Sequence, residues 1–354
     1  MLGGNFMANS NIQKAISVFK SDGLSGVVSH TKHYFNKKQS LKPKTDACKD
    51  ILFINGCSRE LLSQPPRYRI SHQQEQLELN GYTCDEIYYQ GIDLKYVTMY
   101  QTFIIFRAPM TDALNKFIKQ AKKYNKTVIF DIDDLVIDTK YTDCIPYVHS
   151  MKEEQKIQYD KDVMAMKETL QNCDFAITTT EALQRELETY IPKVFINRNT
   201  ASNEMVSLSQ KALKEKKESS KIKIGYFSGS ITHNADFEMI QSVIVETLNQ
   251  YDNVELHLVG ELDLPDELKQ LENKVKVHPF MDYKELPKLI HEMDINLAPL
   301  TESIFNEAKS EIKWIEAALV QVPTIASDFG AFKKCIQHNK NGLLCSTQEE
   351  WKNA

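Results

Sequence analysis

The sequence predicts an α/β protein with two doubly wound domains in series, preceded by a short helical N-terminal arm. Three observations support this fold class: short apolar runs alternate with helical patterns, the alternation stops in a lysine-rich segment, and it then begins again. A chain of 354 residues is long enough for two domains that each bury a core. We expect the arm at 1–48, the first domain at 49–205, a connector at 206–222 and the second domain at 223–354.

The arm is basic and amphipathic. Its apolar residues from Ile12 to Val28 lie near helical spacing, and up to Thr45 it carries seven lysines against one acid, Asp22. Such a helix can lie on an anionic membrane surface, and it can equally be a solvated linker. Both interpretations stay open.

In the first domain, apolar runs predict buried strands, and apolar residues at helical spacing predict the helices between them. The strands are expected at 51–56, 102–108, 127–133, 174–180 and 193–197, and the helices at 71–80, 111–123, 150–171 and 181–190.

The connector is expected because residues 208–223 contain six lysines and two glutamates but almost no apolar side chains. The alternation then resumes, with strands expected at 221–230, 254–260, 273–280, 294–300 and 322–328, and helices at 234–250, 283–291 and 310–320. A new helical pattern begins just before Ala354, so we expect the second domain to be incomplete at its C-terminal end.

Composition excludes several classes of function. Hydrophobic residues make up 42% of the chain and the formal net charge is −5, so no basic excess points to nucleic acid. Seven cysteines without a C-x-x-C pair encode neither a disulfide framework nor a zinc site. No stretch reaches the roughly 20 apolar residues of a membrane span. We expect a cytoplasmic protein with no bound metal or cofactor, and membrane contact that is at most peripheral.

The first strand of the second domain leads into a loop that contains Ser228, Gly229, Ser230 and His233. Ligands of open α/β sheets bind at the carboxyl ends of strands, and small residues at a helix N-terminus let backbone N–H groups approach an anion. The loop is therefore a candidate phosphate site. Ser-Gly-Ser is also an ordinary strand-to-helix turn.

A second candidate lies on the helix expected at 310–320. Lys309, Lys313 and Glu316 are spaced i, i+4 and i+7, so they share one helix face. Two cations near a helix N-terminus can bind a diphosphate, and a carboxylate two turns later can accept both hydroxyls of a ribose. The same spacing also permits ordinary surface salt bridges.

In the first domain, Asp131, Asp133 and Asp134 follow a buried strand. Carboxylates in this place can bind acceptor hydroxyls, take a proton or ligate a metal. Arg67, Arg69 and Arg107 stand at strand ends or helix entries, where bidentate contacts to an acceptor are possible. Each of these residues can also be a structural ion-pair partner or cap.

The order of several segments resembles the GT-B glycosyltransferases, close to family four. The donor-binding half is matched by GYFSGSITHNADF, LHLVG, VKVHPFMDYKELP, the run from INLAPL to ASDFGAF, and NGLLC. The segments RYRISHQQEQLELNG, FRAP and FDIDDLVID resemble the N-terminal half of the bacterial members that build cell-surface polysaccharides. The resemblance covers about residues 50–350 and is most specific from Phe305 to Ser327.

This resemblance implies two Rossmann-like domains, with the nucleotide sugar bound to the second and the acceptor to the first. Glu316 matches the second glutamate of the family's E-x7-E region, which implies ribose binding, but Ala308 stands where the first glutamate is usual. Lys309 and Ser310 occupy its neighbourhood. The basic residues that many relatives place after the first strand are replaced by the loop from Ser228 to His233. We therefore assign the diphosphate to Lys309, Lys313 and the Ser-Gly-Ser backbone.

The expected function is hexosyl transfer from a nucleoside diphosphate sugar to a glycan or lipid-linked glycan acceptor of the cell envelope, at the inner face of the membrane. Family four implies retention of the anomeric configuration. Asp133 and Asp134 are the expected catalytic residues, and the acceptor contacts are expected from Arg67, Arg69, Arg107 and Asp131.

Two alternatives remain from the sequence. The chain can be a non-catalytic nucleotide-sugar-binding module or a fragment of a larger transferase. It can also be a phosphatase of the haloacid-dehalogenase type, because FDIDDLVID resembles the nucleophile motif of those enzymes. However, Leu135 stands where they carry Thr or Val, and no late acidic pair for magnesium follows a strand.

Overall fold

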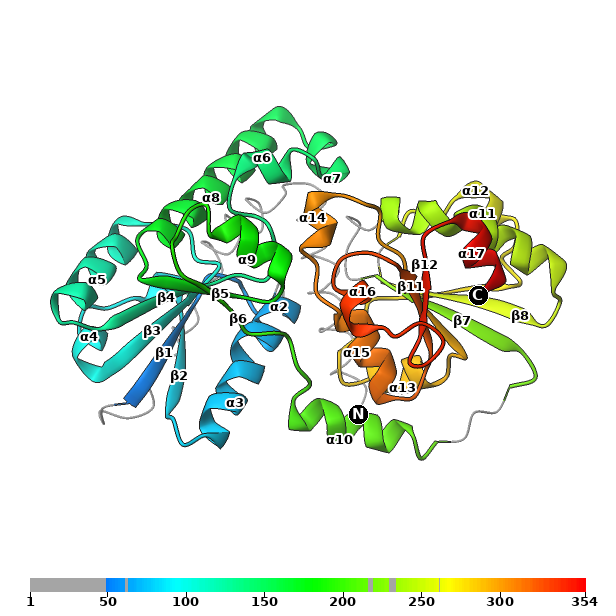
Figure 1. Cartoon of the computed structure of the whole chain (residues 1–354), viewed down its shortest axis with the longest axis horizontal. Coiled ribbons are helices and arrows are strands. Elements are labelled where there is room, and N and C mark those ends of the chain that lie inside the picture. Colours follow the sequence, from blue (N-terminus) through cyan, green and yellow to red (C-terminus); the bar gives the residue numbers. More distant parts are fainter. Residues whose placement is uncertain (1–48, 61–62, 216–218, 229–233, 261) are drawn as a thin grey trace, which may run out of the picture. The chain divides into compact units, whose positions relative to one another are not determined.

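The computed structural model describes residues 49–354 except 61–62, 216–218, 229–233 and 261. The helical arm expected at 1–48 lies outside the described residues. The chain divides into two compact units that meet between Arg198 and Asn199. Each unit contains one six-stranded parallel sheet with helices packed on it (Figure 1). The expected fold class of two doubly wound α/β domains is confirmed.

The first sheet has the strand order β2-β1-β3-β4-β5-β6. Its strands are β1 (Lys49–Asn55), β2 (Cys84–Tyr88), β3 (Tyr100–Phe106), β4 (Thr127–Asp131), β5 (Phe175–Thr178) and β6 (Val194–Ile196). The helices of this unit are α2 (Gln64–Pro66), α3 (His72–Leu79), α4 (Tyr96–Met99), α5 (Asp112–Lys123), α6 (Thr139–Thr142), α7 (Pro146–His149), α8 (Glu153–Gln171) and α9 (Glu181–Leu187), with a π-helical turn at Arg67–Ser71 and a 3-10 turn at Tyr89–Gly91.

The structure adds one strand to the first sheet that the sequence did not predict. In β2, with the sequence CDEIY, only Cys84 and Ile87 are buried. This strand lies at the sheet edge and pairs only with β1. An edge strand needs fewer apolar side chains than a central one, so β2 lacks the apolar run by which the other strands were recognised.

The second sheet has the order β12-β11-β10-β7-β8-β9. Its strands are β7 (Ile222–Phe227), β8 (Val254–Val259), β9 (Val275–His278), β10 (Ile295–Ala298), β11 (Thr324–Ser327) and β12 (Leu343–Cys345). The helices are α10 (Asn203–Ala212), α11 (Asn234–Gln250), α12 (Asp266–Lys269), α13 (Leu286–His291), α14 (Ile304–Glu307), α15 (Ile312–Leu319), α16 (Phe332–Cys335) and α17 (Gln348–Asn353).

The division between the units differs from the connector expected at 206–222. Residues 203–212 form α10, whose Met205 and Ala212 are buried. Ala212 belongs to the same apolar cluster as Leu289 and Ile290 of α13. The apolar residues of this helix are few but fall on one face, so α10 packs on the second unit although the segment as a whole is rich in lysine.

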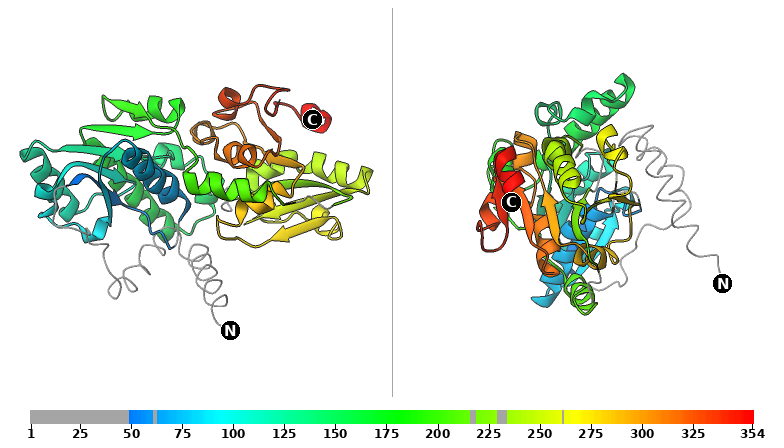
Figure 2. Two further views of the ribbon diagram at one scale, coloured as in Figure 1. Left: turned by 90° about the horizontal axis from the view of Figure 1, so that it is seen from below. Right: turned by 90° about the vertical axis from the view of Figure 1, so that its right-hand side faces the viewer.

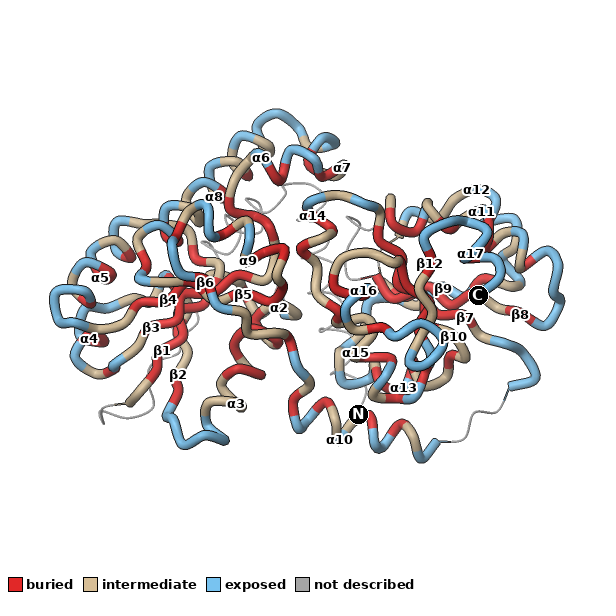
Figure 3. The backbone as a smooth tube through the Cα atoms, in the orientation of Figure 1, coloured by how far each residue is buried: buried red, intermediate tan, exposed pale blue. Residues whose placement is uncertain are grey.

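The strands of the second sheet pack on two separate apolar layers, and Figure 3 shows that the central strands of both sheets are largely buried. In the second sheet, Leu256 and Leu258 of β8 pack on the layer of α11 and α17, and Val259 packs on the layer of α13 and α15. Figure 2 shows helices on both faces of the sheets from two further directions. Each sheet is thereby buried on both sides, as expected for parallel strands.

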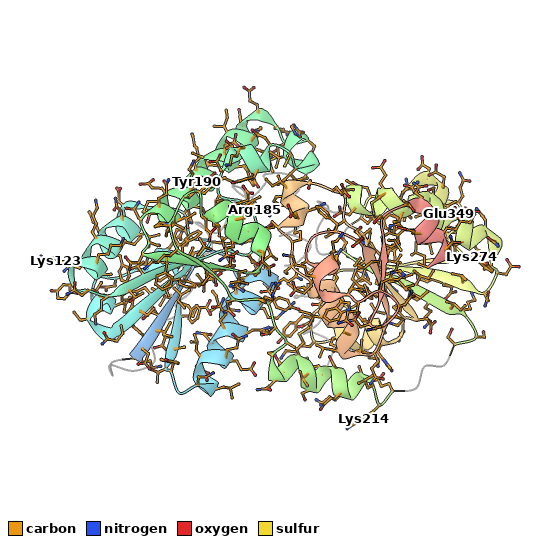
Figure 4. The ribbon with its side chains drawn as sticks, in the orientation of Figure 1. Lys123, Arg185, Tyr190, Lys214, Lys274 and Glu349 are labelled. Carbon is orange, nitrogen blue, oxygen red and sulfur yellow. The ribbon has the colours of Figure 1, made fainter. Side chains whose placement is uncertain are left out.

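Charged side chains lie mainly on the outer surface of this framework. Figure 4 labels Lys123 at the end of α5 and Lys214 after α10, and both side chains are exposed. Within the described residues, no helix is both long enough and apolar enough to cross a membrane.

Candidate functional site

In each sheet the strand order reverses at one place, which we call the switch point. In the second unit it lies between β7 and β10, which pair with each other while the chain continues from them toward opposite edges. In the first unit it lies between β1 and β3. Ligands of open α/β sheets bind beyond the carboxyl ends of the strands at such a point. Most of the predicted site residues follow strands at or next to these two places.

At the switch point of the second unit, the chain after β7 turns tightly against the end of β8. Gly260 has a φ of +92°, and a Cβ atom on it would lie 1.9 Å from the carbonyl oxygen of Ser228. Ser228 is buried, and its N–H donates to a β8 carbonyl over 2.8 Å. Only glycine fits at position 260. Of the predicted phosphate loop, Gly229, Ser230 and His233 lie outside the described residues.

Lys313, in the first turn of α15, carries a buried ammonium group. Among the described residues its Nζ has no hydrogen-bond partner. It lies 4.7 Å from the ring centroid of Tyr226, and the Nζ of Lys309 lies 4.3 Å from the ring centroid of Phe305. Aromatic faces attract cations, but they do not replace the hydrogen bonds that an ammonium group loses on burial. Phosphate oxygens are acceptors that would supply them.

The electrostatics of Lys313 point to the same chemistry. Burial lowers its pKa to about 8, the carboxylates of Asp236 and Glu316 oppose this shift, and the charge of Lys309 adds to it. A ligand that brings negative charge to this ammonium group reverses the shift, and each pKa unit recovered corresponds to about 1.4 kcal/mol of interaction. A strongly shifted lysine at a strand switch point is a functional-site signal with a physical cause.

Ser310 and Glu316 stand on either side of Lys313. Glu316 follows it by three residues on α15 and is buried. The Oγ of Ser310 accepts a hydrogen bond of 3.0 Å from Asn199 Nδ2, which leaves the Ser310 O–H able to donate to another group. The structure therefore brings Lys309, Ser310, Lys313 and Glu316 together on α15 and the turn before it.

Two buried polar residues that we did not single out from the sequence support this region. Asn296 of β10 donates to the carbonyl oxygen of Lys313 and to Thr324 Oγ1, over 3.2 and 3.0 Å. Asp236, in the first turn of α11, accepts three hydrogen bonds from the segment after β10. Each interrupts an otherwise apolar pattern, and that interruption is the signal in the sequence that could have identified them.

At the switch point of the first unit, Gly56 and Arg107 approach each other closely. A Cβ atom on Gly56 would lie 2.3 Å from the Arg107 carbonyl oxygen, and the Gly56 N–H donates to Phe106 O over 2.7 Å. Arg107 itself has a φ of 46°, in the left-handed region that few non-glycine residues adopt. This backbone directs the chain after β3 beside the end of β1.

Arg107 brings the two predicted catalytic carboxylates together. Its Nε donates to Asp133 Oδ1 over 2.7 Å, and its Nη2 lies 2.6 Å from that oxygen and 3.5 Å from Asp134 Oδ2. Burial by itself would lower the pKa of Arg107, but Asp133 and Asp134 raise it above its ordinary value. The Asp133 and Asp134 side chains are 10% and 17% exposed, so both keep some surface for a ligand.

Arg69 and Asp131 form a buried ion pair instead of an open contact site. Arg69 Nη2 lies 2.9 Å from Asp131 Oδ1, and neither side chain is exposed. Arg69 also donates to the carbonyl oxygen of Asn197, and Gln73 donates to Asp131 Oδ2. Burial raises the pKa of Asp131 to about 6, while Arg69 opposes that shift. In this arrangement the pair ties β4 to the turn at 67–71 and to the end of β6.

Arg67 differs from Arg69 and Arg107 in its exposure. It is partly exposed, and its guanidinium stands 5.3 Å from the ring centroid of its neighbour Tyr68. One further ion pair was not expected from the sequence. In it, Arg59 contacts both carboxylate oxygens of Glu86, over 2.9 and 2.6 Å. Glu86 lies on β2, the strand that was not predicted, so the sequence did not indicate that Glu86 would lie beside Arg59.

The burial of Asp131 also bears on the phosphatase alternative. In the resemblance that suggested it, Asp131 occupies the nucleophile position. A nucleophile must reach its substrate, and the Asp131 side chain has no exposed surface and is bonded to Arg69 and Gln73. The structure therefore speaks against this alternative.

No metal cluster is found in the part of the chain that the structure describes, and two of its thiols are held in the protonated form. Its His, Cys, Asp and Glu residues do not gather in any group of three or more that could hold a metal ion. Burial raises the pKa of both Cys57 and Cys84 to about 12, so these thiols are protonated at neutral pH.

Comparison with solved structures supports the fold. A glycosyltransferase from Rickettsia africae aligns with a TM-score of 0.54 at 11% identity, covering 87% of each chain. The sucrose-phosphate synthase of Thermosynechococcus elongatus aligns with a TM-score of 0.51 at 14% identity, covering 86% of this chain and 88% of that one. At these identities the likeness shows the two-domain fold alone.

Comparison of sequences is informative for the second unit. A search of curated protein sequences found no match to this chain. Residues 222–354 match the model of a family described as "Glycosyl transferases group 1". The matched range contains Lys309, Ser310, Lys313 and Glu316. The second unit is therefore similar to group 1 glycosyltransferases over residues 222–354.

Proposed function

We propose that the protein is a glycosyltransferase that transfers a sugar from a nucleoside diphosphate sugar to a glycan acceptor. The observation that carries this proposal is the buried ammonium of Lys313, which has no hydrogen-bond partner among the described residues and stands at the switch point of a group 1 glycosyltransferase domain. A diphosphate provides both the charge and the acceptor oxygens that this group lacks.

In the proposed mechanism, Lys309 and Lys313 stabilise the leaving diphosphate. As the bond between the sugar and the diphosphate breaks, negative charge grows on the diphosphate oxygens. Cations already fixed in a water-poor site stabilise that charge without reorganising. The N-terminus of α15, which begins at Ile312, adds its positive end. Bound metal is not required in this mechanism.

The residues near Lys313 are assigned the other contacts to the donor. Glu316 accepts the two hydroxyls of the ribose, as its match to the family's second glutamate implies. Ser310 donates its hydroxyl hydrogen to the donor sugar or to a phosphate, while Asn199 holds its oxygen. Ser228, which is buried after β7, is assigned to the phosphates, as the resemblance implies for the Ser-Gly-Ser segment.

The acceptor is assigned to the first unit. Asp133 and Asp134, held beside Arg107, bind and orient the attacking hydroxyl, and one of them takes its proton. Arg67 is proposed as a further, partly exposed cation for the acceptor. Arg69 and Asp131 act through structure, since their buried pair positions the end of β4. Transfer with retention of configuration, as in family four, belongs to this proposal.

The acceptor class and location are also part of the proposal. We propose a cell-envelope or surface polysaccharide, free or lipid-linked, as the acceptor, which places the enzyme in the cytoplasm at the inner face of the membrane. The support is the resemblance of the first-domain segments RYRISHQQEQLELNG, FRAP and FDIDDLVID to bacterial enzymes of that type. The basic arm at 1–48 is the proposed membrane contact.

Ligand binding tests the donor assignment directly. UDP, GDP and dTDP are each added to the full chain in EDTA, and the melting temperature is measured. At least one should raise it, because a ligand at about 100 times its Kd stabilises the folded state by about 2.7 kcal/mol. The corresponding nucleotide sugar is then incubated with glycan acceptors and the released diphosphate is measured.

Each outcome has a defined meaning. Diphosphate binding with release that depends on an acceptor supports a transferase, whereas binding without turnover on any acceptor supports the non-catalytic module. If no nucleotide shifts the melting temperature, or if the shift requires magnesium, the metal-free donor site is wrong.

A further inference from the structure

Asp236 is a buried carboxylate at the switch point of the second unit that has no part in the proposed mechanism. It lies in the first turn of α11 and is 2% exposed. Its Oδ1 accepts hydrogen bonds from the backbone N–H of Thr301 over 2.8 Å, from Thr301 Oγ1 over 2.9 Å and from Asn306 Nδ2 over 2.9 Å. One carboxylate oxygen thus joins α11 to two points on the segment after β10.

These contacts fix the segment that leads to the candidate donor residues. Asn306 also donates from Nδ2 to the carbonyl oxygen of Thr301 over 2.9 Å, and Ser303 caps the N-terminus of α14. The chain from 301 to 307 is therefore bonded both to itself and to α11. Lys309 follows directly, so the position of its backbone depends on this anchor.

The charge of Asp236 is not cancelled by these bonds, because all three donors are neutral groups. It acts instead on the side chains around it. The groups that shift the pKa of Lys313 are Asp236 on α11, Lys309 before α15 and Glu316 on α15, and the two carboxylates are the ones that keep it charged. Burial raises the pKa of Tyr226, whose ring lies beside Lys313 Nζ, and the charge of Asp236 adds to that rise.

We propose that Asp236 is a positioning residue of the donor site: it anchors residues 301–306 and is, together with Glu316, a fixed counter-charge of Lys313 when no nucleotide is bound. This inference rests on the proposed function, because it assumes that Lys313 receives the diphosphate. Without a counter-charge, a buried ammonium group flanked by Lys309 would tend to lose its proton. Asp236 therefore extends the pH range over which the site attracts an anion.

The variant Asp236→Asn separates the two roles. An asparagine Oδ1 can accept the same three hydrogen bonds, but it carries no charge. The nucleoside diphosphate that shifts the melting temperature most is titrated into wild type and variant by calorimetry, from pH 6.5 to pH 9.5. The quantity compared is the ratio of variant to wild-type affinity at each pH, in which the titration of the ligand itself cancels.

We expect this ratio to fall as the pH rises. At pH 6.5 Lys313 is protonated in both proteins, and the variant binds at least as tightly because one negative charge near the diphosphate has been removed. At higher pH the variant loses the Lys313 proton first. A pKa lowered by about half to one unit reduces the ratio by about three- to tenfold across the range. A merely structural role would give a ratio that does not change with pH.

Two controls complete the design. Thr301→Val removes one donor to Asp236 but keeps the carboxylate, so its affinity ratio should be constant with pH. Wild type should take up a proton when it binds the diphosphate at pH 8.5, measured in buffers of different ionisation enthalpy, and this uptake should vanish in Lys313→Met. If Asp236→Asn does not fold, the uptake measurement still decides, because binding without proton uptake overturns the inference.

The failure of this inference can be told from failure of the proposed function. If wild type binds no nucleoside diphosphate at any pH, the donor site itself is wrong. If wild type binds and the ratio for Asp236→Asn is flat, the donor site stands and the role of Asp236 as counter-charge is rejected.

Discussion

At the switch point of the first unit and beside it, Arg107 and Arg69 each contact a carboxylate, whereas at the switch point of the second unit Lys313 is buried over an aromatic ring. Among the described residues, no hydrogen-bond acceptor reaches its Nζ. The same topology thus supports two treatments of charge. In the first unit, carboxylates of the protein neutralise Arg69 and Arg107, so these two cations need no ligand. In the second unit, Lys313 has no hydrogen-bond acceptor among the described residues, and a ligand can supply one.

This difference predicts opposite responses to removing a cation. A balanced buried cation leaves an unpaired carboxylate behind when it is deleted, and stability falls. A buried cation that has no hydrogen-bond acceptor costs free energy in the unliganded protein, so its deletion spares stability and weakens only ligand binding.

Arg69→Met should destabilise the first unit by about 3–5 kcal/mol, because it leaves Asp131 buried without its partner, so that the carboxyl must take up a proton to stay in the core. Urea unfolding measures the loss. The double variant Arg69→Met with Asp131→Leu should recover most of it, since no charge is then left in the core. A loss below about 1 kcal/mol for Arg69→Met would mean that the ion pair is balanced by other groups, and the contrast between the units would weaken.

Asp134→Asn and, separately, Asp133→Asn should reduce sugar transfer by about a hundredfold, the usual scale for losing a general base. Nucleotide affinity should change by less than about twofold, because both residues belong to the first unit. Turnover and binding are measured on the same preparation, with Asp143→Asn, an exposed carboxylate after α6, as the matched control. If nucleotide affinity fell as much as turnover, these residues would belong to the donor site and not to the acceptor site.

Lys313→Met should weaken binding of a nucleoside diphosphate by about 1.5–3 kcal/mol, the scale of a hydrogen bond to a charged group. Binding of the nucleoside alone should stay the same, and the salt dependence of diphosphate binding should decrease. Stability of the unliganded protein should hold or rise. Lys333→Met, which removes an exposed lysine of α16, is the matched control. Equal losses for nucleoside and diphosphate would make Lys313 structural.

Glu316→Gln should have the smallest effect, about 1.5 kcal/mol on nucleotide affinity, because glutamine keeps one of the two acceptor oxygens. The diagnostic comparison is between a ribonucleotide and its 2′-deoxy form. Wild type should bind the 2′-deoxy nucleotide more weakly than the ribonucleotide, and the variant should bind the two almost equally. Isothermal titration gives all four affinities. A variant that still prefers the ribonucleotide as strongly as wild type does would remove Glu316 from the ribose contact.

The sequence predicted the parts of this contrast that depend on local pattern. Apolar runs located the strands except two edge strands: β2, whose polar residues left no run to recognise, and β12, which has only three residues. The i, i+4 and i+7 spacing predicted that Lys309, Lys313 and Glu316 share one helix face. Lys313 and Glu316 lie on α15, but Lys309 precedes this helix, which begins at Ile312. Spacing predicts which side chains are neighbours on a helix, but it does not predict what else surrounds them.

The parts that escaped prediction depend on contacts between distant segments. Asp236 meets Thr301 and Asn306 across 65 and 70 residues of chain, and Arg69 meets Asp131 across 62. A carboxylate or guanidinium in a sequence looks the same whether it will be paired inside or offered to a ligand. Burial and partner choice arise only on folding, and they decide which of the predicted arginines remain available.

The packing of α10 on α13 has a practical consequence for recombinant work. A fragment started at residue 222, where the family match begins, would lack this helix. It would uncover the apolar surface of Leu289 and Ile290 and remove Asn199 from the Ser310 hydroxyl. Such a fragment is expected to aggregate on expression and to bind nucleotide with a misplaced serine. A fragment started at Asn199 keeps both contacts, and it is the piece to isolate when the donor half is studied alone.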